Sequence, residues 1–319
     1  MKTLYLLFAI SFFAQCFHSN RNESCDRQPS ADSRKQSVTA SGQGIGKPAV
    51  IEVTDSEKDS LAFEKIMSAT RSTLSQEPDM GKERLLIHIA RALKGIPYVG
   101  QTLEVGKHET LVVNLRQLDC TTYVENVVAM YLCIKNEDYS YSAFKSNLRH
   151  LRYAAGKVAY TSRLHYFTQW IEENTRTGVV NEIQAPTPPF TSNQRLAIDF
   201  MSKHSELYPR LKNNPKDIDE IRLMEKNLTG KVFRYIPKRE IENNRLFRRT
   251  IHNGDIIAIT TKKSGLDTSH IGIAVWHKDG LHLLNASQIH KKVVEEPMLL
   301  REYMQKHPSQ VGIRIVRIN

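Results

Sequence analysis

Cys120 is the residue of this sequence best placed for nucleophilic chemistry. It stands in the stretch NLRQLDCTTYVENVVAMYLCIKN (114–136), where an irregular polar segment turns into a helical pattern. Apolar residues from Val124 to Leu132 recur at i, i+3, i+4, i+7 and i+8, which predicts a helix with Cys120 in its first turn. The N–H groups and the dipole at a helix N-terminus stabilise a thiolate, so this placement predicts a lowered thiol pKa. Cys133 falls nearly on the opposite side of the same helix and is interpreted as core packing.

His270 is the best candidate for the general base that such a thiol needs. It opens the strand pattern HIGIAVW (270–276), whose alternation puts the small residues Gly272 and Ala274 on the face of His270 and the isoleucines on the other face. Because that face carries the smallest side chains, we expect the helix of Cys120 to approach it closely. A histidine at a strand end also has a purely structural interpretation, in which it faces solvent or makes a local hydrogen bond.

The length and composition limit the classes of protein to which this chain can belong. The 319 residues, 40% of them hydrophobic, can build one large or two ordinary domains with a sizeable core. The excess of 45 Lys and Arg over 34 Asp and Glu suits a polyanionic partner such as nucleic acid, anionic lipid or an acidic cell-wall polymer. Zinc-finger spacing, basic heptads and an aromatic RNA-binding signature are absent from the sequence, which argues against nucleic acid. No HExxH or comparable ligand spacing occurs, so we predict neither a metal nor another cofactor.

The first sixteen residues, MKTLYLLFAISFFAQC, have the character of an export signal. The apolar run from Leu4 to Ala14 is too short for a bilayer, which needs ~20 residues, but it has the length of a signal-peptide core. We therefore predict a signal peptide at 1–16 and a periplasmic protein. FAQC is similar to a bacterial lipoprotein cleavage site, although Gln15 is bulkier than the usual small residue, so a membrane tether through Cys16 is the alternative.

The remaining chain divides into two parts. Residues 17–60 are rich in Ser, Asn, Gln, Gly and charge, which predicts a flexible linker. For 61–319 we predict a single domain in which helical patterns come first and strand patterns follow from about residue 255, with Asp279-Gly280 as a hairpin turn. This order predicts an α+β fold with an antiparallel sheet. The polar segment 181–243 has no readable pattern.

Several segments taken together carry a family resemblance. These segments are GIPYVGQTL (95–103), LDCTTYVE (118–125), NGDIIAITT (253–261), DTSHIGIAVW (267–276) and LHLLNASQ (281–288). In this order they resemble the blocks of the NlpC-like cell-wall cysteine hydrolases. TSRLHYFTQW (161–170) and a large insertion between cysteine and histidine, at about 140–250, resemble the N-acetylmuramoyl-L-alanine amidase-like branch. The resemblance spans about residues 80–319 and implies a papain-like, NlpC-like core.

The resemblance also implies an activity and a catalytic set. The reaction is hydrolysis of the amide between the lactyl group of N-acetylmuramic acid and L-alanine, in peptidoglycan fragments (muropeptides) that include anhydro forms. Cys120 is then the nucleophile, and His270 is the base that later protonates the leaving amine. A third group should orient His270. The family often has a histidine in an HAS-like block, but here the block reads NAS, so the role passes to Asn285, with His282 as the alternative.

The expected hairpin tests the choice between Asn285 and His282. A two-residue turn at Asp279-Gly280 would pair position 274 with 285, so that Asn285 shares the face of His270 and His282 points away. It would also set Asn285 and His270 four residues apart, roughly 13 Å at ~3.3 Å per residue. Contact between them therefore requires a bulge or a longer loop.

Four further residues are predicted to bind substrate. Tyr98 lies in the PYVG block, where the family places a tyrosine beside the cysteine, and its hydroxyl could bind the developing oxyanion. The alternative is an aromatic side chain that anchors the loop after Pro97. Arg163, His165 and Tyr166 are predicted to contact sugar and carboxylate groups, against a solvated Arg163 and a packed Tyr166 as the structural alternatives.

Two other functions stay open on the sequence. An NlpC-like endopeptidase that cuts a D-glutamyl bond would use the same three residues and differ only in its pocket. A non-catalytic cell-wall-binding protein would bury Cys120 without activating it. Asp119 and Glu125 are interpreted as helix-start charges rather than catalysts.

Overall fold

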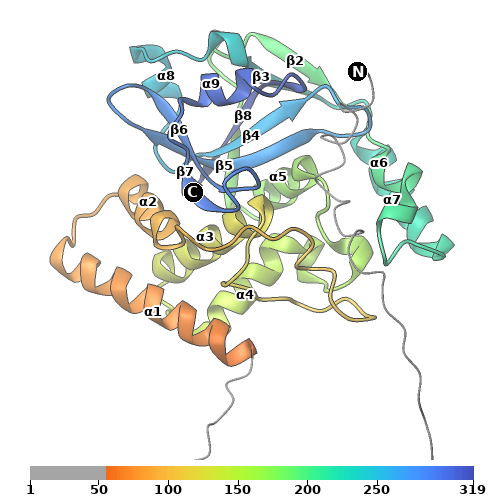
Figure 1. Ribbon diagram of the computed structural model, residues 1–319, viewed down its shortest axis with the longest axis horizontal. Coiled ribbons are helices and arrows are strands. Elements are labelled where there is room, and N and C mark those ends of the chain that lie inside the picture. Colours follow the sequence, from red (N-terminus) through yellow and green to blue (C-terminus); the bar gives the residue numbers. More distant parts are fainter. Residues whose placement is uncertain (1–54) are drawn as a thin grey trace, which may run out of the picture.

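A computed structural model describes residues 55–319 (Figure 1). The predicted signal peptide and most of the predicted linker lie outside the described residues, as does Cys16. The first helix begins at Asp55, so the last residues assigned to the linker are helical. Among the helices of residues 55–319, none combines the length and the apolar character needed to cross a membrane.

Helices make up most of the first half of the described chain. The α-helices are α1 (Asp55–Gln76), α2 (Lys82–Ala92), α3 (Cys120–Lys135), α4 (Tyr141–Arg152), α5 (Phe167–Arg176), α6 (Phe200–Lys203), α7 (Pro215–Leu228), α8 (Arg245–Thr250) and α9 (Leu300–Gln305). Short 3-10 turns are η1 (Ala154–Gly156), η2 (Tyr160–Ser162), η3 (Ser205–Leu207) and η4 (Lys238–Glu240).

The strands form one antiparallel sheet. They are β1 (Val180–Ile183), β2 (Ser192–Arg195), β3 (Val232–Pro237), β4 (Ile256–Thr261), β5 (Thr268–Trp276), β6 (Leu281–Ser287), β7 (Lys292–Glu295) and β8 (Gln310–Ile318). Their order is β2-β3-β8-β4-β5-β6-β7, and β1 also pairs with β8. Every strand pairing is antiparallel. The α+β prediction with an antiparallel sheet is therefore confirmed.

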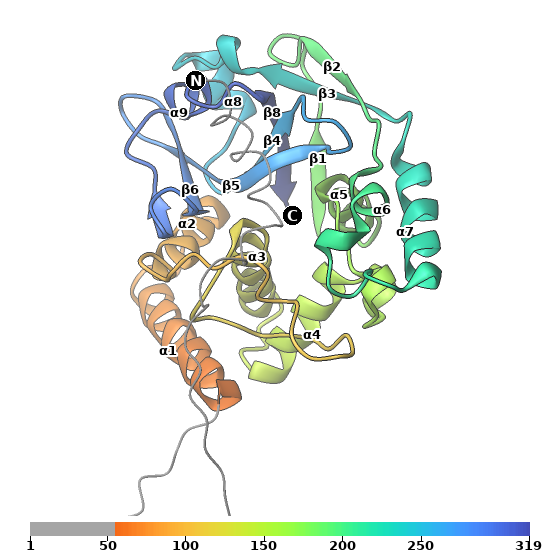
Figure 2. The ribbon, with the colours of Figure 1, turned by 45° about the vertical axis from the view of Figure 1, so that its right-hand side comes forward.

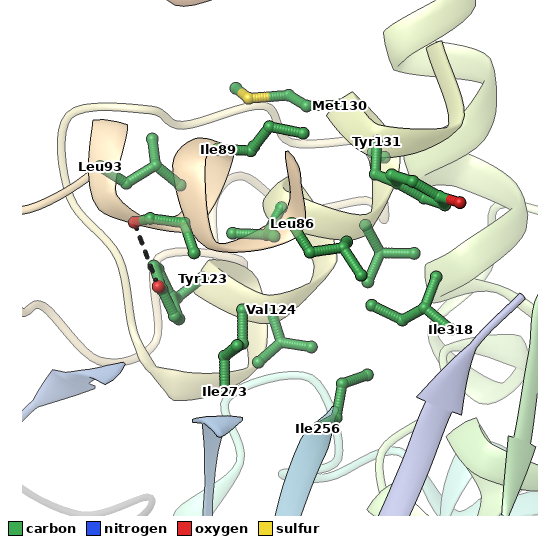
Figure 3. Packing of buried hydrophobic residues seen from close by; sticks show 14 of the residues in the cluster. Leu86, Ile89, Leu93, Tyr123, Val124, Met130, Tyr131, Ile256, Ile273 and Ile318 are labelled. Atoms are coloured by element: carbon green, nitrogen blue, oxygen red, sulfur yellow. Dashed lines mark hydrogen bonds between the residues drawn. The ribbon is translucent and has the colours of Figure 1, made fainter. Parts of the chain in front are cut away.

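Helices cover both faces of the sheet, as Figure 1 shows, with α1 to α5 on one face and α8 and α9 on the other. The alternation of β4 assigns side chains to these two layers. Ile256 and Ala258 join the core under α3, whereas Ile257 and Ile259 join the core under α8 and α9. In Figure 3, Val124 of α3 lies against Ile256 and Ile273 of the sheet. α3 is thus held by apolar packing along nearly its whole length.

The packing of α3 on β5 differs from the sequence prediction. The helix packs on the face of Ile271 and Ile273, not on the face that carries Gly272. Gly272 is small for a different reason. A Cβ built on it would lie 2.8 Å from Leu283 Cδ1 and 2.9 Å from Asn285 Cβ, both on the neighbouring strand β6. The glycine therefore makes room for β6 side chains rather than for the helix.

The segment 181–243, which had no readable pattern, belongs partly to the sheet. Both β1 and β3 pair with the central strand β8. Figure 2 shows α6 and α7 at the end of the sheet that carries β2 and β3. They enclose a small apolar core of their own, which includes Leu211 and Ile221. Residues 140–250, predicted as an insertion, thus supply the three sheet strands β1, β2 and β3 as well as a helical unit.

Candidate active site

Cys120 is the first residue of α3, as predicted. Asp119 precedes the helix and accepts the Thr122 backbone N–H on Oδ1 at 2.8 Å, while the Thr122 hydroxyl accepts the Asp119 backbone N–H at 2.9 Å. This reciprocal capping box satisfies two of the donors that a helix start leaves without partners. Asp119 is therefore a helix-start residue, as predicted, and its cap fixes where Cys120 enters the helix.

The Cys120 sulfur lies at the start of strand β5. Pairing between β5 and β6 begins only at Ile273. The backbone N–H of Ile271, which precedes this pairing, donates to the Cys120 sulfur. The Thr121 side chain and the backbone N–H of Cys120 itself donate to it as well. Burial nevertheless raises the pKa of the Cys120 thiol to about 12, with the Asp119 carboxylate adding to the rise against these three donors. The predicted lowering of the thiol pKa is therefore wrong for the substrate-free protein. Cys120 is only 2% exposed, and the desolvation of its thiolate outweighs the stabilisation by the hydrogen-bond donors.

His270 and Asn285 form a buried hydrogen-bonded pair. The Nε2 of His270 lies 2.9 Å from Asn285 Oδ1, and the Asn285 amide nitrogen donates to the Leu283 carbonyl at 3.3 Å. Because Asn285 Oδ1 can only accept, Nε2 carries the proton and Nδ1 carries the ring lone pair. Burial lowers the pKa of His270 to about 4; the bond to Asn285 opposes this shift, and nearby His307 adds to it. The imidazole is therefore neutral at pH 7.

A longer loop than predicted brings this pair together. Trp276 pairs with Leu281, so the hairpin loop is His277–Gly280 rather than Asp279-Gly280 alone, and the His277 N–H donates to the Gly280 carbonyl at 2.8 Å. Ile273 pairs with Leu284, which sets Asn285 level with position 272, two residues from His270 instead of four. The expected two-residue turn is wrong, and the longer loop supplies the contact.

His282 lies away from this pair. It stands opposite Val275 in the hairpin, and its Nδ1 lies 2.9 Å from the Glu296 carbonyl. Its Nε2 lies 3.2 Å from the carboxylate of Asp279. Of the two residues weighed for the orienting position, the structure brings only Asn285 to His270.

Cys120 and His270 line the same cleft, which we call the His270 cleft. Its lining comprises Cys120, Thr121, Leu164, His165, Tyr166, Phe167, Met201, Tyr208, Leu266, Asp267, Thr268, His270 and Ile271. A second cleft, the Tyr98 cleft, is lined by Tyr98, Gly100, Gln101, Leu103, Glu104, Asp119, Cys120, Thr121, Glu125, Arg152, Arg163, Leu164 and His165. The two clefts have volumes of about 70 and 90 Å³ and share the cysteine end. A substrate that spans both would carry its reacting bond past Cys120.

Tyr98 lies beside Cys120 in the second cleft, as predicted. Its backbone N–H donates to the Lys291 carbonyl at 2.9 Å, and the next N–H, of Val99, donates to the Leu118 carbonyl at 3.1 Å. Burial raises the pKa of Tyr98, with Cys120 and Asp119 adding to the rise, so the hydroxyl stays protonated. Tyr98 therefore anchors its loop and also offers an O–H donor to the cleft.

Arg163 is buried rather than solvated, which excludes that structural alternative. Its guanidinium is paired with Glu104 and lies 3.4 Å from Glu109. It also lies over the Tyr160 ring, 4.8 Å from the centroid. These contacts hold the loop that carries Glu104 against the segment after η2, so Arg163 shapes the wall of the Tyr98 cleft.

Tyr166 and His165 are both tied to neighbouring elements. The Tyr166 hydroxyl donates to Glu225 at 2.7 Å and accepts the Met201 N–H at 3.0 Å, which supports the packing alternative for this residue. The His165 Nε2 lies 2.8 Å from the Tyr160 carbonyl. His165 lines both clefts, whereas the Tyr166 hydroxyl is used within the protein.

The site includes residues that the sequence did not indicate. The Tyr303 ring of α9 lies 6.4 Å from the His270 ring between centroids. Asp267, three residues before His270, accepts the Thr168 and Thr268 backbone N–H groups at 2.6 and 2.7 Å. The position of Asp267 in the DTSH block, beside His270, was the sequence feature that could have indicated it. Across residues 55–319, no group of three or more His, Cys, Asp or Glu side chains could hold a metal ion.

Glu125 has a different role from the helix-start charge assigned to it. It is buried in α3 and accepts a hydrogen bond from Arg152 Nε of α4 at 2.7 Å. Arg152 also donates to the Val112 carbonyl at 2.6 Å. Burial raises the pKa of Glu125, and the Arg152 charge opposes the rise. This ion pair ties α3, α4 and the loop before Cys120 together at the floor of the Tyr98 cleft.

The sequence and the fold correspond to a known family of amidase-like peptidoglycan hydrolases. Residues 88–313 match the AmiA-like family model, described as N-acetylmuramoyl-L-alanine amidase-like. The chain belongs to this family. This confirms the resemblance of its sequence to the N-acetylmuramoyl-L-alanine amidase-like branch. A search of curated proteins gave no match.

Solved structures give the same relationship. A N-acetylmuramoyl-L-alanine amidase from Bacteroides uniformis is 38% identical over 72% of this chain and 95% of its own, with a TM-score of 0.67. A proposed xylanase from Bacteroides fragilis is 40% identical over 72% of this chain and 99% of its own, also with a TM-score of 0.67. A Legionella pneumophila protein of the DUF1460 family model is 24% identical over 81% of this chain and 96% of its own, with a TM-score of 0.60, and is similar in fold alone.

Proposed function

We propose that this protein is an exported, periplasmic cysteine amidase that cleaves the N-acetylmuramoyl-L-alanine bond of muropeptides, including anhydro forms. Its papain-like, NlpC-like core would place Cys120 as nucleophile, His270 as base and Asn285 as the orienting group. One observation carries the proposal: the Cys120 thiol and His270 line one cleft, and the His270 Nε2–H is held by Asn285 at 2.9 Å. The likeness to the Bacteroides uniformis amidase supports the choice of bond.

The reaction begins with a neutral pair. With a thiol pKa of about 12 and an imidazole pKa of about 4, the proton stays on sulfur until a substrate arrives. As Sγ of Cys120 attacks the lactyl carbonyl carbon, His270 Nδ1 takes the thiol proton and the carbonyl oxygen becomes an oxyanion. The Cys120 backbone N–H and the Tyr98 hydroxyl are the donors that would stabilise this oxyanion.

The second half of the reaction restores the enzyme. Collapse of the tetrahedral intermediate breaks the C–N bond, and the His270 imidazolium gives its proton to the departing L-alanine nitrogen. The muramoyl group is left as a thioester on Cys120. Water, deprotonated by His270, then attacks the thioester, which releases the free lactyl carboxylate and the thiol. Asn285 holds the ring so that Nδ1 serves in both steps.

The carboxylates of the clefts argue against glycoside hydrolysis, the activity attached to the Bacteroides fragilis protein. That chemistry generally uses two carboxyl groups, one as acid and one as base or nucleophile. Here Glu125 is paired with Arg152, and Glu104 is paired with Arg163. Asp119 caps α3, and Asp267 accepts two backbone N–H groups. Each of these four carboxylates already has a structural partner.

Product analysis on a defined muropeptide tests the proposal. The wild type should release the intact stem peptide with a free L-alanine amino group, as seen by mass spectrometry. Cys120→Ala should release none, whereas Cys133→Ala, which changes a buried thiol elsewhere on α3, should stay active. A shortened peptide would instead establish the D-glutamyl endopeptidase. Binding without any product would establish the wall-binding protein.

Export and attachment need a separate experiment. The proposal of a periplasmic location rests on the signal-like residues 1–16, with the tether through Cys16 as its alternative. Fractionation of cells that express the full chain should find the protein in the periplasmic extract. Recovery in the membrane fraction, lost on Cys16→Ser, would establish the tether, and recovery in the cytoplasm would refute export.

A further inference from the structure

His165 lies where the two clefts meet. Four residues line both the His270 cleft and the Tyr98 cleft: Cys120, Thr121, Leu164 and His165. A substrate bound across both clefts places its scissile amide at this junction, since the nucleophile is there. The polar groups at the junction are therefore the ones that such a substrate would bring close to the two polar atoms of that amide, its carbonyl oxygen and its N–H.

The tautomer of His165 is set by its backbone partner. Its Nε2 lies 2.8 Å from the Tyr160 carbonyl oxygen, which can only accept, so Nε2 carries the proton. The ring is neutral because burial lowers the pKa of His165 to about 3, with the Arg163 charge adding to the shift. Nδ1 is consequently a lone-pair acceptor, and no side chain or backbone group of residues 55–319 donates a hydrogen bond to it. The Tyr160 ring packs on the imidazole, 4.7 Å between centroids, and restricts its rotation.

The other junction side chains match an amide hydrogen less well. The Thr121 hydroxyl is already oriented by its donation to the Cys120 sulfur, and Leu164 is apolar. Oxyanion donors are available from Tyr98 and the Cys120 backbone, but they match the carbonyl oxygen of the substrate and not its N–H. His165 Nδ1 is thus a junction acceptor that makes no hydrogen bond within residues 55–319 and can complement an amide hydrogen.

We propose that His165 binds the N–H of the scissile amide at Nδ1 and so selects amide over ester substrates and orients the leaving nitrogen. This inference rests on the amidase function proposed above. With its N–H directed to His165, the amide nitrogen can turn its developing lone pair toward His270, the proton donor. The same tautomer argues against the carboxylate contact predicted for His165 from the sequence, since a lone pair repels a carboxylate.

Two matched variants separate the substrate contact from the structural contact. His165→Asn carries a carbonyl oxygen close to the position of Nδ1 but loses the donor to the Tyr160 carbonyl. His165→Gln carries an amide N–H close to the position of Nε2 but loses the acceptor. On a muramoyl-L-alanyl peptide, His165→Gln should lose about 10-fold in kcat/KM, the effect of one hydrogen bond, while His165→Asn stays within about 3-fold of the wild type. In thermal unfolding, His165→Asn should be the less stable variant, because it loses the hydrogen bond to the Tyr160 carbonyl that His165→Gln keeps.

An ester substrate completes the test. The muramoyl-L-lactyl analogue replaces the scissile N–H by oxygen, so His165→Gln should cleave it as fast as the wild type does. Equal losses on amide and ester, or an active Gln variant beside an inactive Asn variant, would overturn the assignment and leave His165 a structural residue. Activity of the wild type on the amide substrate tests the proposed function separately, because an amidase must cleave that substrate whatever the variants do.

Discussion

Gly272 is the position where one added methyl group should separate the hydrogen-bonded pair of His270 and Asn285. An alanine Cβ there would lie 2.9 Å from Asn285 Cβ and 2.8 Å from Leu283 Cδ1. Carbon atoms pack at about 3.5–4.0 Å, so Asn285 must move by about 0.6–1 Å if it yields. Both neighbours are fully buried, and such overpacking typically costs about 1–3 kcal/mol of unfolding free energy.

The displacement matters because the Asn285 bond to His270 is 2.9 Å long. A shift of about 0.6–1 Å takes it past the range of an N–H···O hydrogen bond, which ends near 3.2 Å. Under the proposed mechanism, a His270 without its orienting partner would no longer hold Nδ1 ready to take the Cys120 proton. We expect Gly272→Ala to lower kcat/KM on a muropeptide by about 10- to 100-fold while the protein stays folded, since a misplacement of 1 Å can cost about 100-fold.

A second glycine supplies the control. Gly178 has φ +76 and open space around its missing side chain, so Gly178→Ala introduces backbone strain of about 1–2 kcal/mol at a position that lines neither cleft. The assay is kcat/KM beside thermal unfolding for both variants. The two variants should lose similar stability, but only Gly272→Ala should lose activity. Full activity in a folded Gly272→Ala protein, or equal activity losses in both variants, would refute the reasoning.

Three further predictions concern the buried polar groups. Because burial raises the pKa of Cys120 to about 12, its alkylation by iodoacetamide should accelerate steadily from pH 6 to 9; a plateau over that range would reveal a preformed thiolate. Asn285→Ala should lower kcat by about 100-fold and His282→Ala by less than 3-fold in steady-state assays, since only Asn285 contacts His270; the reverse order would exchange their roles. Arg152→Ala should destabilise the protein by about 3–5 kcal/mol in urea unfolding because it leaves Glu125 buried and unpaired, and a loss below 1 kcal/mol would contradict this.

The local parts of the site could be predicted from the sequence. Helical spacing after Cys120 placed it at a helix start, and strand alternation placed Asn285 on the face of His270. Each conclusion follows from the side-chain periodicity of a single helix or strand. The choice of Asn285 over His282 needed only the parity of a hairpin, which is the same for a loop of two residues or four.

Other features depend on contacts between distant segments. The hairpin loop is four residues long, and Asp279-Gly280 signals a turn without defining where pairing resumes. Which face of β5 receives α3 depends on apolar area summed over several strands, so Gly272 gave the wrong indication. The pKa of Cys120 reflects burial beneath the whole fold, which its helix position could not convey. The short strands β1 and β3 become readable only beside β8.

The most direct test of the account is the mass of the enzyme caught during turnover. A muropeptide reaction quenched in acid and digested should yield the Cys120 peptide carrying the muramoyl half of the substrate as a thioester. That mass identifies the nucleophile and the bond cleaved in one measurement. An adduct of the peptide half would contradict the amidase assignment, and an adduct on another residue would contradict the assignment of Cys120.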